Sequence, residues 1–245
     1  MSRFGLRTRT GLIAPIIQGL QGSSVVTDGL VLNLDASNTA SYPGTGTTWF
    51  DLSPSAYNAT LVNGPTFSTL NGGCIVFDGV NDYATLGNIL NYTTGSFSFS
   101  YWINASSIAN SPVLFYKGAF SVSGYYHQIS PDGSFALVVS QSGAYQFTNT
   151  VAGSITTNTW YNVAITRSGS SIKLYKNGVE TTYATVGTIS NPASSTDNFT
   201  ISSYGSPSAS GYLNGKIASF YGYNKALSGA EVLQNFNSTK GGFGY

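Results

Sequence analysis

The segment Thr159–Glu180 constrains the possible folds of this chain more than any other. Its two runs 160–167 and 172–176 alternate apolar and polar side chains, and a short polar break separates them. The dipeptide Asn177-Gly178 follows, and this pair tolerates the positive φ angles of a tight hairpin turn. Because successive side chains of a strand point to opposite faces, the pattern predicts antiparallel strands with one buried face. Meanders of this kind build β-sandwiches rather than catalytic α/β cores.

Short apolar runs of the same kind recur through the rest of the chain, with Gly, Pro, Asn and Asp between them. Roughly a dozen short strands with turn signals every 8–12 residues or so predict an antiparallel sandwich. No change of composition marks a second globular unit, so we expect one domain, 28–245, preceded by an extended arm, 1–27. The expected strands include Gly29–Ala36, Thr48–Leu52, Cys74–Asp78, Tyr83–Leu86, Phe97–Ile103, Val113–Lys117, Tyr125–Ser130, Phe135–Gln141, Phe199–Ser203 and Tyr212–Tyr223.

The one helix that the sequence predicts is a short helical turn near the C-terminus, Ser228–Phe236. Ser228 is a typical N-cap residue, and Glu231 occupies the third helical position of a capping box. Val232, Leu233 and Phe236 give the turn an apolar side that can pack on the sandwich.

The composition indicates a folded domain with a polar but nearly uncharged surface. Charged residues make up 8% of the 245 residues, against about 25% in an average soluble domain, whereas hydrophobic residues reach 41%. The net charge of +1 gives no electrostatic argument for binding nucleic acid or an anionic membrane. No apolar run approaches the roughly 18 residues that cross a bilayer.

Cys74 is the only cysteine, so neither an intrachain disulfide nor a cysteine metal cluster is possible. It lies in an expected strand, where a small buried apolar role is favoured over a nucleophilic one. The absence of disulfides favours a protein made in a reducing cytoplasm.

Several segments, taken together and in order, resemble the concanavalin A-like superfamily and in particular its laminin-G-like jelly rolls. The match extends over about 29–237, and the joint spacing of the pieces makes it specific. The matching pieces are GLVLNLDASNTASYPGTGTTWFDLS (Gly29–Ser53), NATLVNGPTF (Asn58–Phe67), CIVFDGVNDYATLG (Cys74–Gly87), FSFSYWI (Phe97–Ile103), TWYNVAITRSGSSIKLYKNG (Thr159–Gly178) and GKIASFYGYNKALSGAEVLQNFN (Gly215–Asn237).

The resemblance implies an all-β, two-sheet antiparallel jelly-roll sandwich with one concave sheet. Members of this superfamily bind glycans, occur in adhesion proteins or, in a glucanase branch, cleave polysaccharide. The opening LNLDASNTASYPGTGTTWFDLS and the final NFN are also similar to domains of bacteriophage virion proteins.

A hydrolytic function is not expected, because glycoside cleavage needs two carboxylates on either side of one bond. The chain has only two glutamates, Glu180 after the hairpin turn and Glu231 in the helical turn, and they are not expected to converge. The alternating acidic residues that related glucanases carry along one strand are absent. His127 is the only histidine, so a typical zinc site is excluded, and no Gly-x-Ser-x-Gly elbow supports a serine triad.

Calcium is the ion that the resemblance leaves open, since many members bind it through oxygen ligands. The candidate ligands are Asp35, Asp78, Asn81 and Asp82, and the alternative is that the last three only shape a turn. Many members also carry an acidic residue in the last strand, where this chain has Ala218. We therefore expect no cofactor and no metal in a catalytic role.

Aromatic residues are the stronger indication of function, at 14% of the chain. Sugar C–H faces stack on aromatic rings, while Asn, Ser and Tyr side chains satisfy sugar hydroxyls. Tyr125, Tyr126, His127 and Tyr145 lie on expected neighbouring strands and could line one concave sheet as a glycan site. The alternative is that such residues fill the core or pack at a protein interface, where tyrosine is enriched.

The arm, 1–27, is basic and then apolar, and it is too short to fold alone. Arginines in it would pair with acidic groups of a partner, and isoleucines would fill apolar clefts. The residues expected to bind a partner are Arg3, Arg7, Arg9, Ile13, Ile16 and Ile17.

These observations favour a non-enzymatic bacteriophage virion protein, either a capsid decoration (cement) protein or a fibre component, anchored by its arm. Its partners would be capsid or other virion proteins and further copies of itself, with no nucleic acid and no membrane. The second hypothesis is a glycan-binding adhesion module with a cell-surface glycan as its partner. Arm deletion separates the two, because it should impair assembly under the first and leave sugar binding intact under the second.

Overall fold

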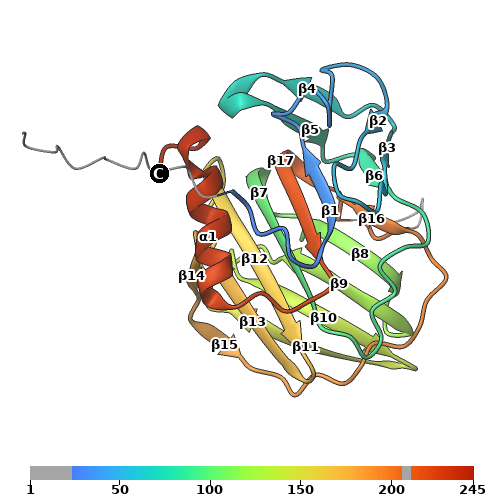
Figure 1. Cartoon of the computed structure of the whole chain (residues 1–245). Helices are drawn as coiled ribbons and strands as arrows, with labels where there is room; N and C mark the ends of the chain where they lie inside the picture. The colour runs from blue at the N-terminus through green and yellow to red at the C-terminus, as the bar shows by residue number, and fades with distance from the viewer. Residues whose placement is uncertain (1–23, 206–210) are drawn as a thin grey trace, which may run out of the picture.

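The computed structural model describes residues 24–205 and 211–245, which form a sandwich of two antiparallel sheets (Figure 1). The predicted fold class is therefore confirmed. The first sheet has eight strands in the order β14-β13-β12-β7-β17-β5-β4, and β1 also pairs with β17. Its strands are β1 (Leu30–Asp35), β4 (Thr66–Ser68), β5 (Cys74–Asp78), β7 (Phe97–Ser107), β12 (Trp160–Ser168), β13 (Ser171–Lys176), β14 (Val179–Glu180) and β17 (Asn214–Tyr223).

The second sheet has nine strands in the order β15-β11-β10-β9-β8-β16-β6-β3-β2. Its order follows the sequence only in part, because β16 inserts between β8 and β6 and joins the two halves of the sheet. Its strands are β2 (Thr48–Trp49), β3 (Ala59–Val62), β6 (Tyr83–Thr85), β8 (Val113–Ala119), β9 (Ser123–Ile129), β10 (Phe135–Gln141), β11 (Ala144–Thr150), β15 (Tyr183–Thr185) and β16 (Phe199–Ile201).

The central hairpin forms as the sequence predicts. β12 pairs with β13, and β13 turns back into β14 through Asn177 and Gly178, with φ angles of 53° and 78°. Alternation along β12 points Val163 and Ile165 into the core between the sheets and Ala164 to the opposite face. The main core consists of such inward-facing residues from both sheets, with a continuous group of aromatic rings around Phe99 at its centre.

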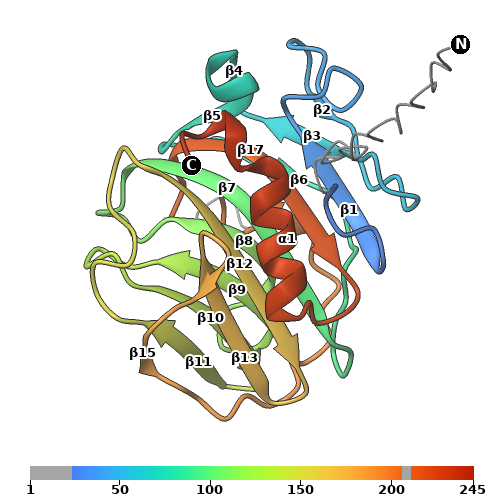
Figure 2. The ribbon, with the colours of Figure 1, turned by 60° about the vertical axis from the view of Figure 1, so that its left-hand side comes forward.

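The C-terminal helix α1 (Gly229–Thr239) covers the outer face of the eight-stranded sheet (Figure 2). Ser228 caps it as expected, and Glu231 completes the capping box. Val232 packs among residues of β12, β13 and β17, and Phe236 packs against Trp102 of β7. The helix continues past the predicted end at Phe236 to Thr239, whose hydroxyl accepts a hydrogen bond of 2.8 Å from the Trp102 Nε1.

Two 3₁₀ turns complete the structure, η1 (Leu70–Gly72) and η2 (Lys240–Gly242). Residues 24–27, which the sequence assigns to the arm, lie on the globular unit: Val26 is buried, and its backbone N–H donates to the Asn235 Oδ1 at 2.8 Å. The remaining arm residues that we singled out, Arg3, Arg7, Arg9, Ile13, Ile16 and Ile17, lie outside the described residues.

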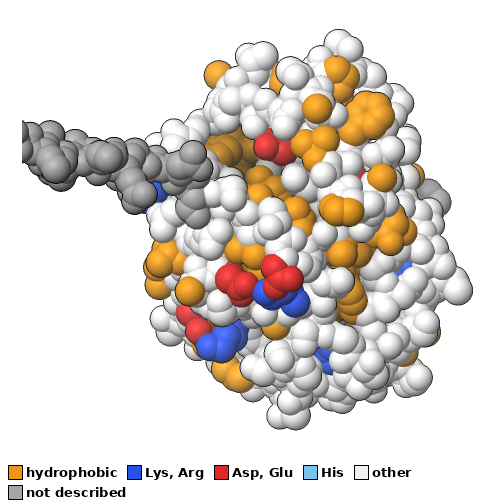
Figure 3. All heavy atoms as spheres, in the orientation of Figure 1, with side chains coloured by type: hydrophobic (Ala, Val, Ile, Leu, Met, Phe, Trp, Pro, Cys, Tyr) orange, Lys and Arg blue, Asp and Glu red, His pale blue; other side chains and the backbone are white. Residues whose placement is uncertain are grey.

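Charged side chains are few on the face drawn in Figure 3, and some of the acidic and basic ones adjoin. Within residues 24–205 and 211–245, the ion pairs are Lys173–Glu180, Lys225–Asp28 and Lys225–Glu231. None of the helices of this part of the chain has the length and hydropathy that a bilayer crossing requires.

Candidate binding groove

Alternation along β9 divides the predicted glycan residues between two faces. Tyr125 and His127 point into the core between the sheets, where 1% and 0% of their surfaces are exposed. Tyr126 belongs to a separate cluster on the outer face of the nine-stranded sheet. Tyr145, on β11, is 50% exposed and lies on that same outer side, among the residues of a groove. The four residues therefore do not line one face: the structure brings Tyr126 and Tyr145 together and separates them from Tyr125 and His127.

Two of the four residues have structural surroundings instead. The Tyr125 hydroxyl donates to the Leu90 carbonyl at 2.7 Å, and its ring stacks on Phe97. The His127 Nδ1 lies 2.8 Å from the Ala136 carbonyl oxygen, and complete burial lowers the His127 pKa to about 3. An imidazole that stays neutral inside the core cannot meet a surface ligand.

The outer face instead carries a groove of about 440 Å3, walled by aromatic rings. Tyr126 lies at its centre, with ring centroids 6.0 Å from Phe120 and 5.6 Å from Tyr204. Tyr145 extends the wall, 5.4 Å from Phe120 and 6.3 Å from Phe147. Phe120 is 52% exposed, so rings at the end of the groove are open to solvent.

The pairing of β9, β10 and β11 explains why the surface is hollowed between these rings. Val138 on β10 is paired with Tyr126 on one side and Phe147 on the other. Ala136, the next outward residue of β10, is paired with Gln128 and Asn149. Small residues on the central strand therefore leave a trough between larger side chains on its two neighbours.

Two amides are among the polar groups of the groove, with the hydroxyls of its serines and tyrosines. The Gln128 Oε1 accepts a hydrogen bond of 2.9 Å from the Tyr204 hydroxyl. The Asn149 Oδ1 is shielded from solvent and has no hydrogen-bond partner among the described residues. A buried acceptor without a donor is costly, so this amide oxygen is a weak point in the hydrogen bonding of the groove wall.

Sequence reasoning did not single out Phe120, Gln128, Phe147, Asn149 or Tyr204. The alternation of β9 contained part of the missing signal, because it separates Tyr126 and Gln128 from their neighbours. Phe147 and Asn149 follow only once the register of β11 on β10 is known, and a sequence does not state that register.

The predicted calcium ligands act mainly as turn residues in this structure. The Asp78 Oδ1 accepts backbone N–H bonds from Val80, Asn81 and Asp82, and these bonds lower the Asp78 pKa against the opposing effect of burial. The Asp82 carboxylate accepts the Asp78 N–H at 3.1 Å, and burial raises its pKa. Within the described residues, no three His, Cys, Asp or Glu side chains are grouped as a metal site.

The remaining candidate reactive groups are engaged elsewhere. The Glu180 carboxylate accepts bonds from Lys173 and the Tyr183 hydroxyl, while Glu231 binds Lys225 and caps α1. Cys74 is buried as expected, and burial raises the pKa of its thiol.

Comparison with known proteins agrees with the two-sheet sandwich. The model of the concanavalin A-like lectin/glucanase superfamily, in its Laminin_G_3 family, matches residues 78–233, more than half of the chain. The chain belongs to this superfamily. A comparison with curated proteins found no match.

Solved structures with the superfamily fold include binding domains of clostridial toxins. The binding domain of botulinum neurotoxin DC in complex with rat synaptotagmin II matches with a TM-score of 0.66 and 18% identity, covering 87% of this chain and 52% of that one. A structure reporting that cell entry of botulinum neurotoxin type C depends on two ganglioside molecules matches with a TM-score of 0.62 and 20% identity, covering 86% of this chain and 51% of that one. Trypanosoma rangeli sialidase with the inhibitor DANA matches with a TM-score of 0.61 and 18% identity, covering 88% of this chain and 34% of that one.

The chain thus spans about half the length of the toxin domains and a third of the sialidase. At these identities the likeness establishes the fold alone.

Proposed function

We propose that this domain is a non-enzymatic binding module that takes a neutral oligosaccharide into the aromatic groove of its nine-stranded sheet. The observation that carries the proposal is the combination of exposed aromatic rings, small floor residues and two amide side chains in one groove. Rings present apolar faces to sugar C–H groups, and the amides provide hydrogen bonds that fix orientation. The toxin neighbours, one of which interacts with gangliosides, support a recognition role for the fold.

The charge of the groove supports a neutral ligand. None of the described residues that line it carries a charged side chain. A carboxylate or sulfate on a sugar would lose hydration there without gaining a cationic partner. Neutral glycans incur no such cost.

The same lining supports binding without cleavage. Glycoside hydrolysis by the usual route needs two carboxyl groups within about 10 Å of each other across the scissile bond. The described groove residues include no Asp or Glu, and Glu180 and Glu231 are held in ion pairs elsewhere.

A substitution at the open end of the groove tests the proposal. Tyr145→Ala removes a half-exposed ring, and we expect it to weaken binding of neutral oligosaccharides at least tenfold by isothermal titration calorimetry. Tyr57→Ala removes a tyrosine of 37% exposure outside the groove and should leave affinity unchanged. Equal affinities of the Tyr145→Ala variant and the unaltered protein would contradict the proposal, as would the absence of binding across a broad neutral-glycan array.

A second role, in a bacteriophage virion, is proposed from the way the chain enters the domain. The Gln234 side chain donates to the Ser24 carbonyl at 2.9 Å, and Val26 is fixed to Asn235, so residue 24 lies against α1. Helix α1 covers the outer face of the eight-stranded sheet, opposite the groove (Figures 1 and 2). An arm attached here would bind a particle from one side and leave the groove facing outward.

Under this proposal the protein decorates a capsid or forms part of a fibre, with capsid or other virion proteins and further copies of itself as partners. Co-sedimentation with purified virions or capsid shells should show saturable binding of the full chain and loss of binding for a variant lacking residues 1–23. Groove binding of glycans should persist in that variant. If the full chain stays free of the particles, the virion role is refuted and the glycan role is unaffected.

A further inference from the structure

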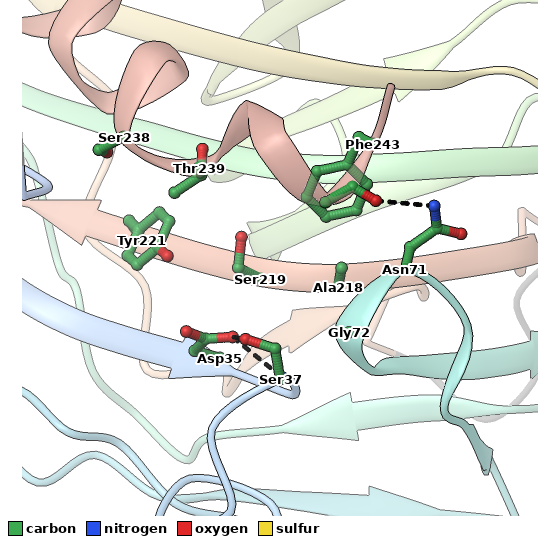
Figure 4. Close-up of a pocket in the computed structure, with 11 residues that line it drawn as sticks. Asp35, Ser37, Asn71, Gly72, Ala218, Ser219, Tyr221, Ser238, Thr239 and Phe243 are labelled. Carbon is green, nitrogen blue, oxygen red and sulfur yellow. Dashed lines mark hydrogen bonds between the residues drawn. The ribbon is translucent and has the colours of Figure 1, made fainter. Parts of the chain in front are cut away.

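A second cavity lies on the opposite side of the molecule, at the C-terminal end of α1. It has a volume of about 280 Å3 and lies between β17, the end of β1, η1 and η2 (Figure 4). Figure 4 shows side chains of β1, η1, β17 and the end of α1, together with Phe243 just after η2, around one space. None of the residues that line it contributes to the aromatic groove.

Polar side chains concentrate on one side of this cavity. The Asp35 Oδ1 accepts bonds from the Ser37 N–H at 3.0 Å and from the Ser37 hydroxyl at 2.7 Å, which fixes the carboxylate and leaves its Oδ2 available. Ser219 is 5% exposed, and its hydroxyl interacts with that of Tyr221, whose pKa it lowers against the larger effect of burial. Tyr221 is 4% exposed; burial raises its pKa and the nearby Asp35 carboxylate raises it further, so its hydroxyl stays protonated.

The other side of the cavity is held rigid by Asn71. This residue adopts a left-handed conformation, with φ of 55°, at the tip of η1. Its Nδ2 donates to the Gly242 carbonyl at 2.8 Å, and its Oδ1 accepts from the Trp160 Nε1 at 3.0 Å. The cavity is therefore formed before any ligand arrives, which lowers the entropic cost of binding.

We propose that this cavity is a separate binding site for a small neutral polyol, the size of a single sugar ring. A fixed carboxylate oxygen accepts from sugar hydroxyls, and the Tyr221 hydroxyl can both donate to and accept from them. The volume is at the lower end of the range of about 300–1,000 Å3 for small-molecule sites, so it suits one ring rather than an oligosaccharide. The lining carries one carboxylate and no cationic side chain, which disfavours acidic sugars.

The test uses saturation-transfer-difference NMR of the full chain with D-glucose, D-galactose, D-mannose, N-acetylglucosamine and D-glucuronate. We expect at least one neutral sugar to bind, and glucuronate not to bind. Asp35→Asn and Tyr221→Phe keep the shapes of the side chains and should each weaken binding at least fivefold. Asp132→Asn is the matched control, because the Asp132 Oδ1 accepts the Ser134 N–H and hydroxyl in the same kind of turn, away from the cavity.

The groove variant Tyr145→Ala separates this proposal from the proposed function. Binding that persists in Tyr145→Ala and falls in Asp35→Asn and Tyr221→Phe, with melting temperatures unchanged, supports the cavity site. Binding lost in Tyr145→Ala but kept in Asp35→Asn and Tyr221→Phe assigns the sugar to the groove and overturns the cavity proposal. Absence of binding by all the neutral sugars also overturns it, since the cavity would then hold water only.

Discussion

Trp102 of β7 and Phe243, near the C-terminus, stack face to face with ring centroids 4.0 Å apart and planes inclined by 12°. Phe236 and Tyr245 flank the same indole, with centroids each 5.8 Å from it. The indole is fully buried on the outer face of the eight-stranded sheet. The final residues of the chain therefore complete the covering of this sheet, which α1 alone would leave open.

We predict that Phe243→Ala destabilises the domain by about 1–3 kcal/mol, since it removes both buried apolar area and an aromatic pair. The Trp102 indole would become more exposed to solvent, so its fluorescence maximum should shift to longer wavelength in the folded protein. Urea unfolding and emission spectra measure both effects. Tyr245→Phe, which removes only the hydroxyl that donates to the Trp160 carbonyl at 2.7 Å, is the control and should leave the emission unchanged.

How much of this fold the sequence predicts depends on how far apart along the chain the interacting residues lie. The Asn177-Gly178 turn and the Ser228 cap are local, and residue types within four positions determine them. The last turn of α1, up to Thr239, also makes a contact that is not local, the hydrogen bond from Trp102 of β7. Of the residues that line the groove, the sequence singled out Tyr126 and Tyr145. The others on β9, β10 and β11 are brought together by strand pairing, and the sequence does not state the register of that pairing.

Substitutions at two turn glycines can distinguish the cost of a strained backbone from the cost of a steric clash. Gly178 has φ of 78°, and a Cβ there would lie 2.9 Å from the Leu233 Cδ1 and 3.1 Å from the Phe236 Cβ. Gly169, in the preceding hairpin, has φ of 58° and nothing within 4 Å of such a Cβ. We predict that Gly169→Ala costs roughly 1–2 kcal/mol for the left-handed backbone alone, and that Gly178→Ala costs more because α1 must shift as well. Equal shifts of the urea midpoint would show that α1 yields freely at this contact.

Lys117 is a buried cation that holds a long connection to the nine-stranded sheet. It is 1% exposed, and its Nζ donates to the Asn88 Oδ1 at 2.6 Å and to the Asp197 carbonyl. Lys117→Met keeps the apolar stem but leaves both acceptors without their donor, so we expect a loss of about 1–3 kcal/mol. Faster amide hydrogen exchange should appear in the connection 186–198.

Lys173→Met serves as the comparison for Lys117→Met. Lys173 is exposed and pairs with Glu180 at the surface, where ion pairs contribute little to stability. We expect little change in unfolding and none in exchange of 186–198. A similar loss in both variants would contradict a special role for Lys117.

The buried imidazole of His127 predicts how stability depends on pH. Burial lowers its pKa in the folded protein to about 3, whereas an unfolded chain has the ordinary value near 6.5, so the unfolded state binds the proton more tightly. The contribution of His127 to the free energy of unfolding is therefore fully present above pH 6.5 and is lost as the pH falls from there toward 3. The loss amounts to roughly 1.4 kcal/mol per pH unit, or several kcal/mol in all. His127→Phe has no proton to bind and packs among the same rings, Tyr101, Phe115 and Phe135. The unfolding free energies of the two proteins are measured by urea titration at intervals from pH 7 to 4. Both proteins retain every carboxylate, so only the protonation of His127 changes the difference between them. If the variant is the less stable at pH 7, the two free energies should converge as the pH falls. A difference that stays constant over this range would show that His127 titrates alike in the folded and unfolded chains.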